Sequence, residues 1–151
     1  LGGESAEVVA TAAALVDPAI GAAGDFDSVQ VMLKTASGRQ AVISNSRRAT
    51  YGYDQRIEVH GSLGSVSAEN QRAVSIEVAT ASGYTRPPLL DFFMTRYTEA
   101  YAAEIASFVA AVGGNGKAEP TGEDGLIALA LAEAALKSVA EARVVKMSEL
   151  L

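Results

Sequence analysis

Two tyrosines on either side of a glycine form the segment best suited to ligand binding. The sequence reads Tyr51-Gly52-Tyr53-Asp54 at the end of an expected strand. A tyrosine hydroxyl can donate and accept hydrogen bonds with a polyol, while the aromatic ring contacts apolar carbon atoms. Gly52 permits backbone conformations that strain other residues. Tyr53 and Tyr51 are therefore candidate ligand-binding residues, although a tyrosine packed in the core with its hydroxyl hydrogen-bonded explains the pattern equally well.

His60 is the only histidine in the sequence, and histidine is the side chain best suited to proton transfer near neutral pH. The alternation of polar and apolar residues places His60 in the polar phase of an expected strand, just before the turn G-S-L-G. Glu58 lies two residues earlier on the same face. This position favours a surface or interface histidine over a catalytic one.

Asp25 and Asp27 form a D-x-D pair beside Gly24, and paired carboxylates can bind a metal ion or share a proton. No histidine or cysteine lies near enough in sequence to complete the ligand spacing of a transition-metal site. We therefore interpret the pair as part of a solvent-exposed turn and predict no metal site.

The remaining motifs exclude several kinds of site. The chain has no cysteine, so it forms neither a disulfide nor a cysteine-ligated metal site. No serine lies in a G-x-S-x-G segment, and the glycine clusters at 21–24 and 113–116 lack the context of a phosphate loop. No G-x-G-x-x-G segment follows an expected strand. The sequence therefore contains no predicted catalytic or cofactor-binding residue.

Charge and hydropathy narrow the range of partners. Eighteen acidic and twelve basic side chains give a net charge of −6, whereas nucleic-acid binding needs clustered Lys and Arg. No apolar run reaches the ~18 residues of a membrane span, so we expect neither nucleic acid nor membrane as a partner. The lack of cysteine and of a signal-peptide pattern at the start favours a cytoplasmic location.

The elements that must position these residues begin with strands. Apolar and polar residues alternate with a period of two in several segments, and Ser37-Gly38 and G-S-L-G are turn signals between them. Short strands joined by short turns predict antiparallel neighbours, because parallel neighbours need long crossover connections. A weakly patterned stretch at 7–16 is interpreted as a further strand leading into a loop at 17–25. The other expected strands are 28–34, 40–46, 56–60, 66–68 and 74–78, and regular structure is expected to break between 80 and 93.

Two helices are expected in the last third. An apolar stripe at helical spacing runs from Tyr97 to Val112. A second helix covers 123–142, with Thr121 as its N-cap, and 143–147 is a possible final strand. This second helix is apolar nearly all round, which indicates contact with protein beyond the sheet, such as a further domain or a second subunit. The predicted architecture of the 151-residue chain is a single α+β domain, an open, mainly antiparallel sheet with helices packed on one face.

Four groups of short motifs, in this order and spacing, resemble the carboxy-terminal domain of the glucose–fructose oxidoreductase and inositol dehydrogenase family. The first pairs V-D-P-A-I-G with A-G-D, and the second pairs N-S-R-R with Y-G-Y-D-Q-R. The third is Glu104-Ile105 with Phe108, and the fourth is T-G-E-D-G from Thr121. Each motif alone is weakly specific, but together they cover nearly the whole chain.

The resemblance implies an enzyme that oxidises a cyclitol hydroxyl, such as that of myo-inositol, to a ketone by hydride transfer to NAD, with NADP as the alternative cofactor. It places the Rossmann domain, an E-K-P lysine and a D-x-x-x-H pair upstream of this chain, and none of these motifs is present here. It assigns Tyr53 to hydrogen bonding with the cyclitol, with Tyr51 as the weaker candidate. Residues 1–151 are then the substrate-binding and oligomerisation domain of a longer dehydrogenase.

The resemblance also implies a homodimer or homotetramer formed through an exposed sheet face. The expected polar phase is lightly charged, which suits an interface, although a solvated face explains it as well. That phase includes Gln30, Met32, His60 and Ser75.

Two alternatives stay open. The first keeps the family and replaces the cyclitol by an aldose or another sugar. The second is a non-catalytic binding or assembly module, which the apolar helix at 123–142 disfavours because a large uncovered apolar face promotes association.

Overall fold

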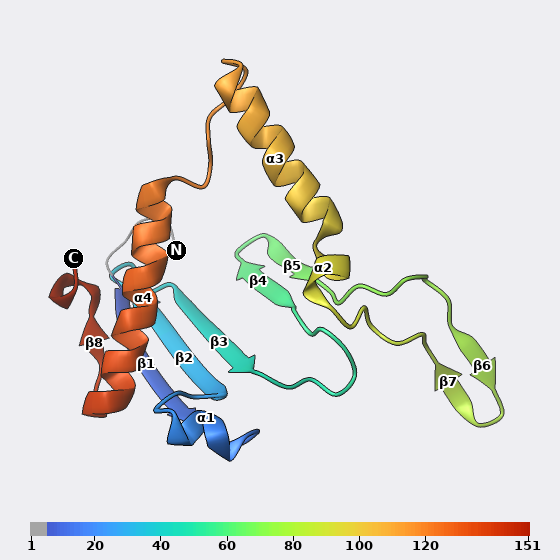
Figure 1. The fold of residues 1–151 in the computed structure, drawn as a ribbon, viewed down its shortest axis with the longest axis horizontal. Coiled ribbons are helices and arrows are strands. Elements are labelled where there is room, and N and C mark those ends of the chain that lie inside the picture. Colours follow the sequence, from blue (N-terminus) through green and yellow to red (C-terminus); the bar gives the residue numbers. More distant parts are fainter. Residues whose placement is uncertain (1–5) are drawn as a thin grey trace. The chain divides into compact units, whose positions relative to one another are not determined.

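The computed structural model describes residues 6–151, which group into two compact units (Figure 1). The first unit contains residues 6–48 and 119–151, so it is built from both ends of the described chain. The second unit is the intervening segment Ala49–Ala118.

The first unit is organised around an antiparallel sheet with the strand order β3-β2-β1-β8. Its strands are β1 (Ala6–Ala13), β2 (Ser28–Thr35), β3 (Gln40–Ser46) and β8 (Val145–Lys146). The strands predicted at 7–16, 28–34, 40–46 and 143–147 are thereby confirmed, and their pairing is antiparallel as predicted. The α+β class with open antiparallel sheets is confirmed as well.

Helix α4 (Gly122–Glu141) covers one face of this sheet (Figure 1). It begins with a capping box in which Thr121 Oγ1 accepts the Asp124 N–H and the Asp124 carboxylate accepts the Thr121 N–H at 2.7 Å. The hydrogen bonds from the Thr121 backbone and hydroxyl lower the pKa of Asp124. The small residues Ala130 and Ala134, one turn apart, let the helix approach the sheet closely. The core consists of Val8, Ala10, Val31, Leu33, Ala130, Ala134, Val145 and Met147.

Ser138 on α4 is fully buried and completes the hydrogen bonding of the sheet. Strand β8 pairs with Glu7 and Val8 of β1 but ends before Ala10. The Ala10 N–H donates instead to Ser138 Oγ at 3.0 Å, and Ser138 Oγ donates to the Arg143 carbonyl at 2.6 Å. A serine in the last turn of an apolar helix therefore replaces the missing strand partner.

Replacing Ser138 by alanine is expected to lower the free energy of unfolding by about 1–3 kcal/mol, because the Ala10 N–H is then buried without an acceptor. The shift in the urea unfolding midpoint measures this loss. Ser67→Ala, on an exposed position of a hairpin, is the matched control and should change stability by less than about 0.5 kcal/mol. Equal shifts in both variants would contradict the role assigned to Ser138.

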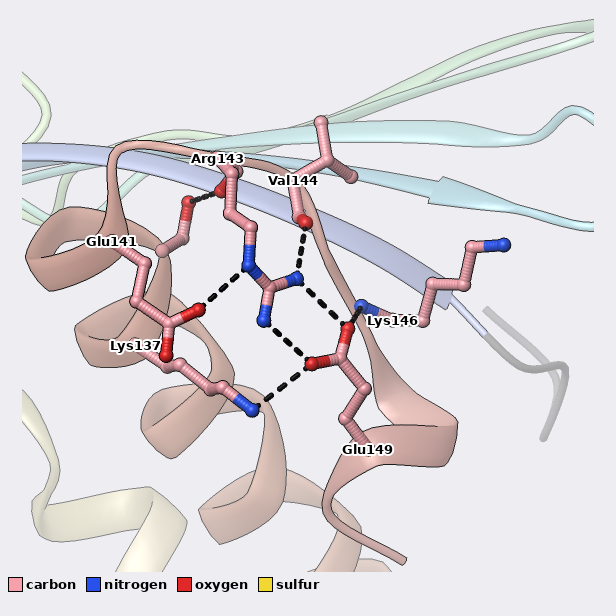
Figure 2. A network of polar contacts seen from close by, with 7 residues as sticks. Lys137, Glu141, Arg143, Val144, Lys146 and Glu149 are labelled. Carbon is pink, nitrogen blue, oxygen red and sulfur yellow. Dashed lines mark hydrogen bonds and ion pairs between the residues drawn. The ribbon is translucent and has the colours of Figure 1, made fainter.

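A cluster of charged residues holds the C-terminal segment on α4 (Figure 2). Glu149, in the short 3₁₀ helix Met147–Glu149, accepts hydrogen bonds from Arg143 Nη2 at 2.7 Å and Lys137 Nζ at 2.9 Å. Arg143 also donates to Glu141 at 2.6 Å. The Arg143 guanidinium and the Lys146 N–H hold the pKa of Glu149 well below its usual range. Because these side chains are partly solvated, the cluster orients β8 more than it stabilises the fold.

The second unit consists of two hairpins and two helices (Figure 1). The hairpins pair β4 (Ile57–Gly61) with β5 (Gly64–Ala68) and β6 (Val78–Thr80) with β7 (Gly83–Thr85). The helices are α2 (Phe93–Arg96) and α3 (Thr98–Val112). Leu89 is the one buried side chain within 49–118. The hairpin predicted around G-S-L-G and the helix predicted at 97–112 are confirmed.

Three predictions for individual segments are wrong. The expected loop at 17–25 contains the short helix α1 (Pro18–Ala22), which Asp17 caps and Pro18 starts, the usual place for a proline. The expected strand at 74–78 reaches regular pairing only at Val78, because Thr80 and Gly83 close a later hairpin. The expected break between 80 and 93 contains strand β7.

The predicted exposed sheet face is also smaller than expected. Gln30 and Met32 lie on the exposed face of the four-stranded sheet. His60 belongs to the separate β4–β5 hairpin, and Ser75 lies in no strand. The alternation of residues identifies the two faces of a strand, but it does not reveal which strands join one sheet.

Candidate functional site

The segment Tyr51-Gly52-Tyr53-Asp54 forms a tight turn against a second backbone segment. The Tyr53 N–H donates to the Leu90 carbonyl at 2.8 Å, which fixes the turn. Gly52 has φ of +126°, a conformation that favours glycine. A Cβ at this position would lie 2.6 Å from Leu89 Cβ, so the close approach also requires glycine.

Asp54 is the centre of the polar contacts in this turn, and its side chain is only 15% exposed. Its carboxylate accepts hydrogen bonds from Arg56 at 2.8 and 2.9 Å, from Asn70 Nδ2 at 2.6 Å, and from the Tyr51 hydroxyl. The Arg56 guanidinium, followed by the Tyr51 hydroxyl and the Asn70 amide, lowers the pKa of Asp54 to about 2. The carboxylate is therefore ionised at neutral pH and holds the turn from three directions.

The two candidate tyrosines are used differently in this arrangement. The hydrogen bond to Asp54 raises the pKa of Tyr51 and engages its hydroxyl within the turn. Tyr53 is 36% exposed, and its ring meets the Tyr97 ring edge-on, with centroids 5.7 Å apart and an interplanar angle of 84°. Tyr53 is thus the better placed of the two to reach a ligand, and ligand binding by either remains a prediction.

Tyr97, Gln55 and Asn70 complete the site. The Tyr97 hydroxyl donates to Gln55 Oε1, and the Gln55 N–H donates to Asn70 Oδ1 at 2.8 Å. Burial, followed by the neighbouring Tyr53 hydroxyl, raises the pKa of Tyr97. The Arg96 guanidinium lies 5.5 Å from the centre of the Tyr97 ring. Beside the ionised Asp54–Arg56 pair, the site therefore has hydroxyl and amide groups next to aromatic carbon, which are groups that suit a polyol.

Sequence reasoning did not identify these last residues as functional. Tyr97 belongs to an apolar helical stripe, Gln55 lies in the Y-G-Y-D-Q-R motif without an assigned role, and Asn70 lies in none of the four motif groups. Tyr97 and Gln55 are 42 residues apart in the chain, so only the folded structure brings them together.

The D-x-D pair does not form a single site. Asp27 is 2% exposed, so its expected position in a solvated turn is wrong. Its carboxylate accepts the N–H groups of Leu15, Val16 and Asp17 at 2.8–2.9 Å. Asp25, by contrast, accepts the Phe26 N–H at 2.8 Å and stays exposed. Among residues 6–151, no three His, Asp or Glu side chains are grouped to hold a metal ion.

His60 lies on the surface of the β4–β5 hairpin, 77% exposed, with Nε2 2.5 Å from Glu58 Oε1. This is the surface position with Glu58 on the same face that the alternation predicted.

The first unit contains an apolar hollow of about 480 Å³ between α4 and the sheet. Leu131, Ala135 and Val139 line it from the helix, and Val29 and Val31 line it from β2. Asn45 is the one polar residue in its lining, and no titratable side chain lines it. Within residues 6–151, no helix combines the length and apolarity needed to cross a membrane.

Comparison with known proteins gives consistent matches along the chain. The family model described as the oxidoreductase family, C-terminal alpha/beta domain, matches residues 1–147. The inositol 2-dehydrogenase of Rhizobium meliloti is 69% identical over 98% of this chain and 45% of its own length. The scyllo-inositol 2-dehydrogenase (NAD(+)) of Bacillus subtilis is 32% identical over 78% of this chain and 34% of its own length.

A solved structure agrees with these matches. The crystal structure of a putative myo-inositol dehydrogenase from Sinorhizobium meliloti superposes with a TM-score of 0.92 at 69% identity. The match covers 97% of this chain and 45% of that one. The chain therefore spans less than half the length of the proteins it resembles.

Proposed function

This chain belongs to the oxidoreductase family and carries its C-terminal α/β domain, and from this premise we propose that it is the substrate-binding part of an NAD-dependent inositol dehydrogenase. The proposed substrate is myo-inositol or a related cyclitol, oxidised to the corresponding ketone, 2-keto-myo-inositol for myo-inositol itself. The names of the similar proteins support this substrate class. The observation that carries the proposal is the geometry of Tyr53, whose backbone is fixed by Leu90 while its ring remains accessible.

In the proposed reaction the substrate alcohol loses a hydride to NAD⁺ and a proton to a base, which gives a ketone, NADH and H⁺. The described residues do not fit the dinucleotide, because no strand leads through a glycine-rich turn into a helix that could hold its pyrophosphate. We therefore assign the cofactor, and the catalytic lysine, aspartate and histidine, to a Rossmann domain outside this chain. The role of this chain is to bind and orient the polyol.

Tyr53 is proposed to donate a hydrogen bond to a hydroxyl of the bound cyclitol, with the exposed part of its ring against the carbon skeleton. Tyr51 contributes less, because its hydroxyl is already engaged by Asp54. Asp54, Arg56 and Asn70 keep the turn in place and need not touch the substrate.

Replacing Tyr53 by phenylalanine in the complete gene product should raise KM for myo-inositol roughly 5- to 10-fold, because one substrate hydrogen bond is lost. KM for NAD should not change. Steady-state kinetics with each substrate varied in turn measures both constants. Tyr84→Phe, at an exposed position of β7, is the control. An unchanged KM for myo-inositol in the Tyr53 variant would count against the proposal.

The same hydroxyl groups suit other polyols, so an aldose or another sugar is the alternative substrate. Initial rates of the complete gene product with myo-inositol, scyllo-inositol and aldoses decide between these substrates. The intact mass of that gene product separately tests the non-catalytic alternative. A mass matching residues 1–151 alone would remove dehydrogenase activity from the polypeptide, whereas roughly 150 further residues would fit the proposed Rossmann domain.

We also propose that the sheet face opposite α4 joins copies of the enzyme into a homodimer or homotetramer. The pairing aligns Val9, Met32 and Val42 across β1, β2 and β3, and all three side chains are exposed. Sedimentation velocity of the complete gene product tests this proposal, and a monomer would contradict it.

The cytoplasmic location expected from the cysteine-free sequence is likewise a proposal.

A further inference from the structure

We propose that Tyr97, held by Gln55, is a positioning residue that orients Tyr53 toward the cyclitol and so determines how tightly the substrate binds. This inference rests on the proposed role of Tyr53 and extends it to residues of a distant segment.

The Tyr97 ring is fixed at the junction of two helices. It follows α2 and precedes α3, with its N–H donated to the Phe93 carbonyl and its carbonyl accepting the Tyr101 N–H, both at 2.9 Å. A residue held by its backbone on both sides provides a rigid surface. The edge-on contact at 5.7 Å restricts the rotation of the Tyr53 ring against that surface.

The Tyr97 hydroxyl is held as well. It donates to Gln55 Oε1, and the Gln55 backbone is anchored through Asn70, which in turn donates to Asp54 at 2.6 Å. The residues on either side of Tyr53 are thus fixed, Gly52 against Leu89 and Asp54 by its donors. The contact with Tyr97 then restricts what the backbone leaves free, the side-chain rotations that set the direction of the Tyr53 ring.

Positioning and simple packing require different parts of the Tyr97 side chain. Packing requires only the ring, and Tyr97→Phe preserves the ring. Positioning requires the hydroxyl and an acceptor for it. Gln55→Glu keeps an acceptor oxygen, whereas Gln55→Met removes it at similar length.

The test is steady-state kinetics of the complete gene product. Tyr97→Phe and Gln55→Met should each raise KM for myo-inositol roughly 3- to 10-fold, with kcat changed less than about 2-fold and KM for NAD unchanged. The single variant Gln55→Glu keeps an acceptor, so its KM for myo-inositol should stay near that of the unsubstituted protein. Because Tyr97 acts through Tyr53, KM for myo-inositol should be no higher in the double variant Tyr53→Phe/Tyr97→Phe than in Tyr53→Phe alone.

The outcomes separate this inference from the function on which it rests. If Tyr53→Phe weakens inositol binding and Tyr97→Phe does not, or if the two effects simply multiply, the positioning role is wrong and the proposed function stands. If Tyr53→Phe has no effect, both are overturned. Equal melting temperatures of the single variants ensure that KM reports binding and not partial unfolding.

Discussion

Replacing Gly52 by alanine is expected to reduce kcat/KM for myo-inositol about 100-fold or more, because the turn that carries Tyr53 can no longer approach Leu89. A Cβ on residue 52 would lie 2.6 Å from Leu89 Cβ and 3.2 Å from the Leu90 carbonyl oxygen. Besides this clash, the backbone φ of +126° at residue 52 is itself unfavourable for alanine. Both effects push the turn away from the segment that accepts the Tyr53 N–H.

The displacement reaches Tyr53 directly, since its N–H bonds to Leu90 at 2.8 Å and Leu90 adjoins the clash. A shift of about 1 Å at a substrate-positioning residue is enough to lower the rate by two orders of magnitude. Steady-state kinetics of the complete gene product measures the loss, and a thermal melt shows whether the variant is folded.

Gly83→Ala is a matched control for this experiment. Gly83 has φ of +114°, similarly unfavourable for alanine, but a Cβ there meets no atom within 4 Å. It should therefore show the effect of backbone strain without the clash, and leave kcat/KM nearly unchanged. If Gly52→Ala also kept its activity within about 3-fold, the assignment of the turn to substrate binding would be wrong.

The parts of the fold that could be predicted are those whose causes are local in sequence. Strands β2 and β3 follow from an alternation of residues, and α4 follows from Thr121, Asp124 and a long apolar segment. The segment 74–78 shows the limit of predicting strands from alternation alone. Its residues alternate as in a strand, but a strand forms only where a partner is available, and partners are set by the fold.

The candidate site could be predicted only in part for the same reason. The Y-G-Y-D motif predicts a turn with two tyrosines. The local sequence does not show that the Tyr51 hydroxyl is the one bound to Asp54. Tyr97 appears in the sequence as one apolar position of a helix, and its contact with Tyr53 arises from tertiary structure. The burial of Asp27 likewise depends on the return of the segment at 15–17, which sequence spacing does not reveal.

Asp27 leads to the second large effect, which is on stability. Replacing Asp27 by asparagine is expected to lower the melting temperature by roughly 5–10 °C at neutral pH. The carboxylate accepts three consecutive N–H groups, from Leu15, Val16 and Asp17, and a hydrogen bond from the Ser28 hydroxyl at 2.9 Å. An amide has a single acceptor oxygen and would turn its own N–H groups toward some of these donors. The segment between β1 and α1 would then lose its attachment to β2.

The pH dependence of this effect identifies its cause. Burial by itself raises the pKa of Asp27, but the backbone N–H groups and the Ser28 hydroxyl outweigh it and lower the pKa to about 2. An unfolded aspartate titrates near pH ~4, so the folded state binds the proton more weakly than the unfolded state. The stabilisation is therefore complete above pH ~4 and is lost as the pH falls toward ~2.

The difference in melting temperature between the unsubstituted protein and Asp27→Asn should shrink over this interval. Asp25→Asn, at the exposed neighbour, should show little difference at any pH. A difference for Asp27→Asn that stayed constant from pH ~7 to pH ~2 would show that the segment is held by packing and not by the ionised carboxylate.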